Sequence, residues 1–174
     1  MTVAGFGMLS GSLVMSATAS RRPRLIHVIL FELATALCFI LMGLKPWMFL
    51  VGAAAFGAHF LIAFIQGTTR ALLQRQADPA IQGRVFAAWQ MATESVRLLA
   101  FLTTGLLADR IFEPLLMEHG LLAGTVGRIL GTGPGRGVAF MFVLMGAAKL
   151  LVSLIYAVRL RSAVKPGSIA EERA

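Results

Sequence analysis

Charged residues and cysteine are both scarce in this sequence of 174 residues. Charged side chains make up only 14% of the chain, against about 25% in an ordinary globular domain. This scarcity argues against a disordered chain and against a charged coiled coil. The single cysteine, Cys38, excludes an intramolecular disulfide, and with it a small secreted domain stabilised by disulfides.

Apolar residues are correspondingly abundant. They make up 57% of the chain, and the mean hydropathy is +0.80. A soluble domain of this length buries only about 70% of the surface that its unfolded chain exposes. Water would therefore meet far too much apolar surface, and the sequence predicts an all-α, polytopic, integral membrane protein.

Five apolar runs are each long enough to cross about 30 Å of hydrocarbon as a helix. We expect them to form a transmembrane bundle over residues 1–160, followed by a disordered cytoplasmic tail over residues 161–174. The expected spans are residues 3–19, 25–43, 47–66, 85–107 and 137–158.

Basic residues cluster between these runs and predict the orientation of the chain. With five spans, ten basic residues fall on one side and four on the other. The larger set belongs in the cytoplasm, so we expect a plasma (inner) membrane protein with its C-terminus cytoplasmic. The net charge of +8 then reflects orientation, and we expect no nucleic acid partner. The cytoplasmic set is Arg21, Arg22, Arg24, Arg70, Arg75, Arg84, Arg159, Arg161, Lys165 and Arg173; the outer set is Lys45, Arg110, Arg128 and Arg136.

The first run begins almost at Met1, which allows two interpretations. Small residues around Ala17 and Ala19 could form the cleavage site of a signal peptide. However, no basic residue precedes the run and three arginines follow it, which is the reverse of a signal peptide. We favour a start inside a longer ancestral protein, with the preceding helices missing.

Several motifs resemble exporters of the major facilitator superfamily, in the subset that includes enterobactin and macrolide exporters. The linker Gln76–Phe86, with Gly83-Arg84-Val85-Phe86 entering a span, resembles the loop between helices ten and eleven of that family. Further support comes from Gly7–Leu13, Ala108–Leu115 and Gly133–Gly137.

This resemblance implies that the five spans are helices eight to twelve of a twelve-helix fold. It also implies transport, as the C-terminal part of a secondary active, proton-coupled exporter of small amphiphilic molecules such as drugs or siderophores. The expected partners are the lipid bilayer, a small-molecule substrate, and a polypeptide or a second copy that supplies the missing helices. The alternative is a non-transporting membrane subunit or a truncated remnant of such a transporter.

Ionisable residues inside the spans are the candidate functional residues, because their burial in a membrane is costly. Glu94 and Arg97 lie three residues apart, so they share one helix face and can neutralise each other. Counted from Arg84, they lie about 15 to 20 Å deep at 1.5 Å per residue. A carboxylate at that depth could carry a proton for coupled export, or the pair could be a static contact between helices.

A second group lies in the third span. His59, Phe60 and Gln66 line the central cavity if the resemblance holds, together with Phe56 and Phe64. A neutral histidine among aromatic rings could bind an amphiphilic substrate, or it could simply pack. Two further charges, Glu32 and Lys149, are expected in peripheral helices; Lys149 could extend to the interface or pair with Glu94.

No residue set resembles an enzyme site, and we expect no catalysis, cofactor or metal. The run Gly131–Gly137 lacks the Gly-Lys-Ser/Thr ending of a phosphate loop and is expected to be a flexible hinge into the last span. The preceding segment from Ala108 is amphipathic enough to lie on the outer membrane surface, and could otherwise form a lid.

Overall fold

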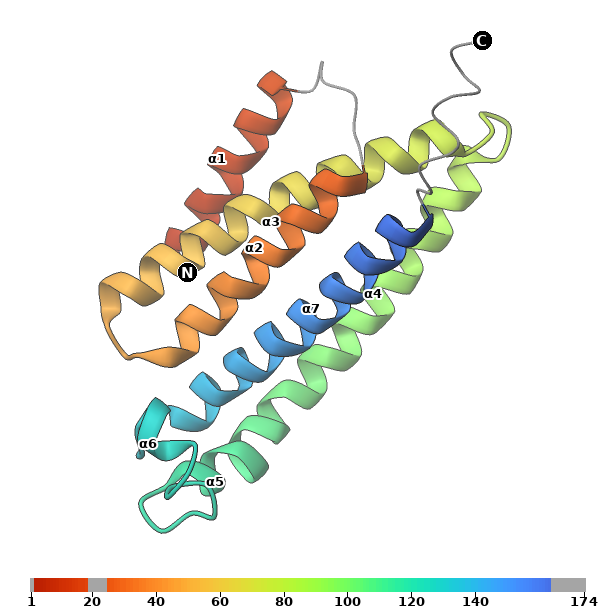
Figure 1. Cartoon of the computed structure of the whole chain (residues 1–174). Coiled ribbons are helices and arrows are strands. Elements are labelled where there is room, and N and C mark those ends of the chain that lie inside the picture. Colours follow the sequence, from red (N-terminus) through yellow and green to blue (C-terminus); the bar gives the residue numbers. More distant parts are fainter. Residues whose placement is uncertain (1, 19–24, 164–174) are drawn as a thin grey trace.

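The described part of the chain is helical throughout apart from the turns between helices. The computed structural model describes residues 2–18 and 25–163, with side chains up to Leu160. No strand occurs within those ranges. The elements are α1 (Thr2–Thr18), α2 (Leu25–Leu44), α3 (Met48–Gln76), α4 (Gln82–Leu107), the π-helical turn η1 (Ala108–Phe112), α5 (Glu113–Leu116), α6 (Gly127–Leu130) and α7 (Arg136–Ala163) (Figure 1).

The protein is an all-α polytopic membrane protein. Four helices within the described residues are long and apolar enough to cross a bilayer, where the sequence predicts five. The difference is α1, whose 17 residues extend over about 26 Å at 1.5 Å per residue, against a hydrocarbon core of about 30 Å. The four are Leu25–Leu44, Met48–Gln76, Gln82–Leu116 and Arg136–Leu160.

Several helices extend beyond the apolar runs. The helix α3 continues ten residues past Gln66 and includes Arg70 and Arg75. The fourth helix runs on past Leu107 through η1 and α5 to Leu116, so the first part of the segment expected on the membrane surface or in a lid is a continuation of that helix. The helix α7 reaches Ala163, into the expected tail, whose remaining residues lie outside the described part. The sequence prediction placed the charged residues that follow each apolar run in loops, although a membrane helix can carry charged residues at its ends.

Small residues let the helices approach closely. A Cβ atom added at Gly7 or Gly11 of α1 would lie 2.5 Å from the carbonyl oxygen of Phe56 or Phe60 of α3. On the other side, a Cβ at Gly146 of α7 would lie 2.8 Å from the carbonyl oxygen of Ala36 in α2. In a membrane, helices associate by such close backbone contact rather than by burying apolar surface from water. The result is a packed unit in the order α1, α3, α2, α7.

An ion pair joins α2 to α7 inside this unit. The ammonium of Lys149 contacts the carboxylate of Glu32, and each side chain is about a quarter exposed. The expected alternatives for Lys149, a position at the interface or a pair with Glu94, are therefore wrong. Glu32 lies on the helix that packs along α7, whereas Glu94 pairs within its own helix.

The glycine-rich entry to α7 is held in place rather than free. The N–H groups of Gly135 and Gly137 both donate to the carboxylate of Glu113, the second over 3.1 Å. Gly131, Gly133 and Gly135 have positive φ, which other residues rarely adopt. A carboxylate at a helix N-terminus also complements the helix dipole. The turn is thus a cap closed by Glu113, and these N–H groups are not open to a phosphate.

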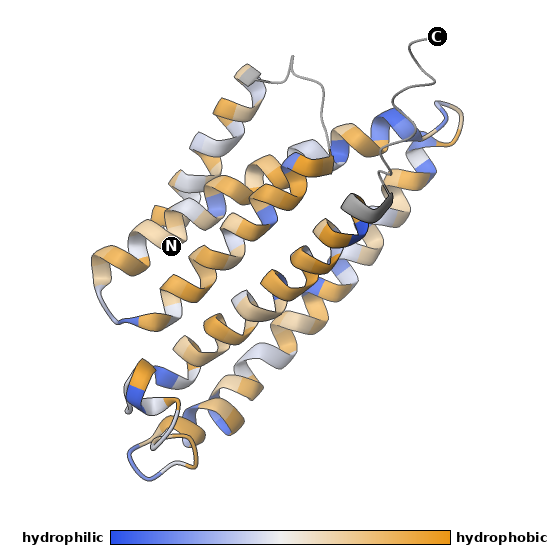
Figure 2. Ribbon diagram, in the orientation of Figure 1, coloured by the Kyte–Doolittle hydropathy of each residue, from blue (hydrophilic) through white to orange (hydrophobic). Residues whose placement is uncertain are grey.

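The outer surface of the bundle is apolar. Figure 2 shows hydrophobic residues along most of the long helices, with hydrophilic residues concentrated at the helix ends and in the turns. At most 17% of any candidate span is buried inside the molecule. Apolar side chains that face outward in this way are suited to contact with lipid tails.

Candidate functional site

The candidate site lies between α3 and α4, which are joined by a tight turn. The backbone N–H of Ala80 donates to the side chain of Asp78 over 2.9 Å, and the N–H of Ile81 donates to the Asp78 carbonyl over 3.0 Å. In addition, the side-chain amide of Gln82 donates to the carbonyl of Gln74 over 3.1 Å. These bonds reverse the chain and place the last turns of α3 beside the first turns of α4 (Figure 1).

A small polar cleft lies between side chains of the two helices, whose backbones are not closely packed against each other. It has a volume of about 150 Å³ and brings together three of the residues predicted from sequence: Gln66, Glu94 and Arg97. The full lining is Ile65, Gln66, Thr69 and Arg70 from α3 with Trp89, Gln90, Thr93, Glu94 and Arg97 from α4. Two charged guanidiniums, one carboxylate and two amides therefore share one small space.

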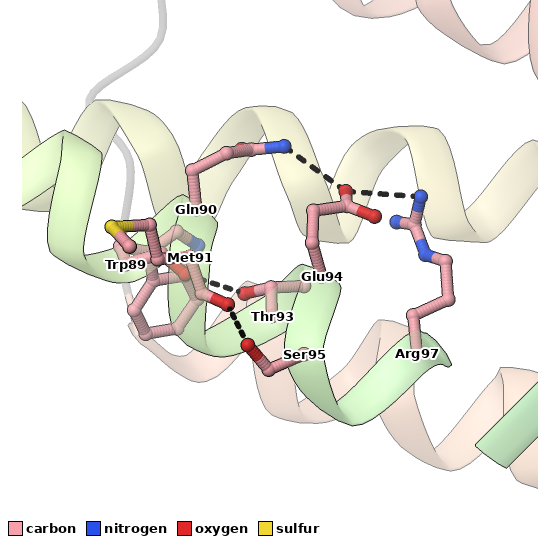
Figure 3. A network of polar contacts seen from close by, with 7 residues as sticks. All are labelled: Trp89, Gln90, Met91, Thr93, Glu94, Ser95 and Arg97. Carbon is pink, nitrogen blue, oxygen red and sulfur yellow. Dashed lines mark hydrogen bonds and ion pairs between the residues drawn. The ribbon is translucent and has the colours of Figure 1, made fainter. Parts of the chain in front are cut away.

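Glu94 is the centre of the hydrogen bonding in this cleft (Figure 3). Its Oε1 accepts a hydrogen bond from Gln90 Nε2 at 3.0 Å and lies 3.1 Å from Arg97 Nη1. The three side chains extend from one side of α4, because they are spaced four and three residues apart. The pairing of Glu94 with Arg97, predicted from their spacing, is confirmed. Both contacts fall on one carboxylate oxygen, so the second oxygen stays open to another donor.

The site is open rather than buried. Glu94 is 45% and Arg97 66% exposed, and no residue of α4 is buried. A charged pair exposed to hydrocarbon would be costly. A cleft of this kind between membrane-spanning helices therefore requires water, substrate or another helix against it. The arrangement presents an open carboxylate oxygen of Glu94 and the largely exposed guanidinium of Arg97 to any group that enters the cleft.

The hydroxyl groups of α4 do not take part in the network. Thr93 Oγ1 donates to the carbonyl of Trp89 and Ser95 Oγ to that of Met91, both over 2.8 Å (Figure 3). Such bonds satisfy a hydroxyl within its own helix, which is a common arrangement in membrane helices. The remaining polar chemistry of α4 is therefore carried by Gln90, Glu94 and Arg97.

His59 and Phe60 lie elsewhere on α3. His59 lies seven residues before Gln66, on the same helix face, but it does not line the cleft. Its Nδ1 is 2.8 Å from the carbonyl oxygen of Ala55, so the ring is bonded within its own helix. Phe60 belongs to an aromatic stack with Phe56 and Phe64, and Phe64 also contacts Phe31 of α2. The aromatic group and the polar group thus occupy different faces of α3.

Sequence reasoning missed Arg70 and Gln90, the remaining guanidinium and amide of the cleft. Arg70 was assigned to a cytoplasmic loop, although it lies four residues after Gln66 and thus on the same face if the helix continues. Gln90 lies four residues before Glu94, the spacing at which a glutamine amide meets a carboxylate on a helix. Helical periodicity could have predicted that both residues lie on the same helix faces as Gln66 and Glu94. No group of three or more His, Cys, Asp or Glu that could hold a metal occurs in the described residues.

Comparison with known proteins gives no relatives for this chain: no family model, no curated protein and no solved structure matches it.

Proposed function

We propose that this chain forms the C-terminal part of a secondary active exporter of the major facilitator type. It would move small amphiphilic molecules such as drugs or siderophores outward, driven by proton movement. The observation that carries this proposal is the cleft between α3 and α4, where a carboxylate, two guanidiniums and two amides meet within membrane-spanning helices. Groups of this kind inside a membrane are costly and usually functional.

Glu94 would couple the proton to the substrate. When ionised, it holds Arg97 and Gln90 through one oxygen. Both contacts use Oε1, so a cationic or hydrogen-bond donor group of the substrate could bind the second oxygen of Glu94 while the carboxylate is ionised. Protonation would remove the charge and release that group, and deprotonation would restore the site. Proton binding and substrate binding would thus compete for the same carboxylate.

The arrangement of the other helices supports the same fold. In the twelve-helix scheme, α2 and α7 would be helices nine and twelve, which are peripheral, and α3 would be helix ten, which lines the cavity. Here α2 and α7 pack along each other and pair Glu32 with Lys149, away from the polar cleft. The cleft itself is formed by α3 and α4, the proposed helices ten and eleven.

A complete transport pathway would need more helices than these. Since no residue of α4 is buried, the open side of the cleft would be covered by another polypeptide or by a second copy of the chain. The exposed face of α4 equally fits the alternative of a non-transporting membrane subunit, in which Glu94 and Arg97 only help α4 pack against a partner. No role in catalysis or with a cofactor is part of either proposal.

Everted membrane vesicles from the native host separate the two possibilities. Ethidium is added to energised vesicles, and its accumulation and the accompanying proton release are followed by fluorescence. We expect both signals in the wild type and the loss of both in Glu94→Gln. The control is Glu118→Gln, which removes a carboxylate outside the long helices and should leave both signals unchanged. Equal signals in vesicles with and without the chain would favour the non-transporting subunit.

A further inference from the structure

Small and polar residues form a row along α4. Residues spaced alternately three and four apart lie on one face of a helix, as they do along the contact of a coiled coil. On α4 this spacing connects the network of Gln90, Glu94 and Arg97 to residues before and after it. We call this row the α4 seam. Its members are Gly83, Ala87, Gln90, Glu94, Arg97, Phe101 and Thr104.

The next row around α4 has a different composition. Its members are Met91, Ser95, Leu98 and Leu102, and the three apolar side chains among them are all exposed. Long apolar side chains are suited to lipid, whereas contacts between membrane helices are rich in small residues and in polar residues that bond across the contact. The seam, with Phe101 as its one large apolar residue, therefore has the composition of a helix contact.

No helix in the described part of the chain packs closely on the seam. The backbone of α4 is not closely packed against another long helix, and none of its residues is buried. Within the seam, the side chains of Glu94 and Arg97 are about half and two thirds exposed. Because charges left at a surface within a membrane span are costly, the seam requires a covering contact from outside this copy of the chain.

The ion pair at the centre of the seam is incomplete and complements itself. The described contacts of the pair use Oε1 of Glu94 and Nη1 of Arg97, so acceptor sites on the carboxylate and donors on the guanidinium are left over (Figure 3). A second, identical pair lacks the same groups in the same number. The two residues differ in depth by about 4.5 Å, at 1.5 Å per residue, which the long arginine side chain can span. In two parallel copies, each Glu94 can therefore accept from Arg97 of the other copy.

We propose that the α4 seam is a homodimer interface, in which it packs along the seam of a second copy about a two-fold axis perpendicular to the membrane. The basic residues predict the same orientation for every copy, so the two α4 helices run parallel. This inference rests on the cleft of the proposed function and names the second copy as the partner that covers it. A carboxylate has about four acceptor sites, so Glu94 can bind the second copy and still offer a site to a substrate.

Exchange of the charges between two copies tests this interface. Two differently tagged full-length copies are co-expressed, one is captured from solubilised membranes, and the fraction of the other that co-purifies is measured. We expect wild-type copies to co-purify, as should two copies of the control Glu118→Arg, which lies outside the long helices. Two copies of Glu94→Arg, or two of Arg97→Glu, should lose the association because like charges meet. One copy of each should recover it, because opposite charges then face each other and both variants are shown to fold.

Cysteine cross-linking tests the seam without changing its charges. In a Cys38→Ala background, Phe101→Cys places a thiol on the seam and Leu102→Cys places one on the neighbouring row, at nearly the same depth. Native membranes are oxidised with copper phenanthroline. Phe101→Cys should form a disulfide-linked dimer, whereas Leu102→Cys should stay monomeric. Equal cross-linking at the two positions, or a link from Phe101→Cys to a protein of another size, would overturn the proposal.

The co-purification results would also overturn the proposal if wild-type copies fail to associate, if either variant associates with itself as the wild type does, or if the mixed pair does not recover. None of these measurements depends on transport. A dimer without ethidium accumulation would keep this interface and favour the non-transporting subunit. Ethidium accumulation by a chain whose copies do not associate would keep the exporter and exclude the interface.

Discussion

The two sides of this molecule are built differently. On one side, α1, α2, α3 and α7 form a packed unit through glycine contacts and the pair of Glu32 with Lys149. On the other side, α4 has no buried residue and carries the cluster of Gln90, Glu94 and Arg97. Both sides contain an acid and a base within a span. Only the second leaves them largely exposed, at 45% and 66% against 27% for each partner of the first pair.

The two ion pairs therefore differ in how much they contribute to helix packing. Lys149 and Glu32 sit across a contact between two helices, so their pairing contributes to packing. Glu94 and Arg97 lie on one helix and do not join it to another, so their pairing adds little to the fold. Charges that do not stabilise the fold, yet lie within a membrane span, are those expected to act on a proton or a ligand.

Replacement of the glutamate by glutamine in each of the two ion pairs should give the largest difference in stability between the two sides of the molecule. Glu32→Gln leaves the ammonium of Lys149 without its partner near the middle of α7, and we expect a loss of about 3 kcal/mol, the cost of a lysine at the centre of a membrane helix. Glu94→Gln should cost less than about 0.5 kcal/mol, because exposed ion pairs contribute little. Unfolding of both variants by dodecyl sulfate in mixed micelles measures the difference.

A double variant provides the control for this contrast. Glu32→Gln combined with Lys149→Met removes both charges and should recover most of the lost stability, since no unpaired charge remains. Equal losses for Glu32→Gln and Glu94→Gln would contradict the division between a packed unit and an exposed helix.

Glycine substitutions should give the next largest effect. A leucine at Gly11 would collide with the backbone of α3, and overpacking of this kind typically costs about 1 to 3 kcal/mol. Gly105 of α4 has nothing within 4 Å of an added Cβ, so Gly105→Leu should be neutral or stabilise the helix by up to about 1 kcal/mol. Thermal unfolding in detergent measures the stability of the Gly11→Leu and Gly105→Leu variants. A stable Gly11→Leu variant would show that α1 does not depend on close contact with α3.

The cap that Glu113 forms at the start of α7 should give the smallest effect, because it joins the two sides of the molecule only at their ends. Glu113 lies where the fourth helix ends and accepts hydrogen bonds from Gly135 and Gly137 at the start of α7. Glu113→Ala should cost about 1 kcal/mol, as for loss of a helix cap, and should speed proteolysis within residues 117–135. Glu118→Ala is the matched control and should change neither property. Identical cleavage of both variants would mean that Glu113 does not hold the cap.

The helices were largely predictable from the sequence, because long apolar runs have few alternatives in a membrane. The continuation of α3 through Arg70 and of α4 into η1 was missed, since hydropathy alone reports where a span is apolar and not where its helix ends. In the site, the pair of Glu94 with Arg97 followed from local spacing. The pair of Glu32 with Lys149 did not, because it depends on which helices pack together, and periodicity carries no such information.

The most direct test of this account compares two neighbouring positions on α4. Thr93 lines the cleft, whereas Ser95 does not, although both are exposed hydroxyl residues at nearly the same depth. Each is changed to cysteine in a Cys38→Ala background, and a charged, water-soluble methanethiosulfonate is applied to native membranes. A water-lined cleft predicts rapid labelling of Thr93→Cys and slow labelling of Ser95→Cys, which should face lipid. Equal labelling rates at the two positions would contradict the proposal that this cleft is a water-lined part of a transport pathway.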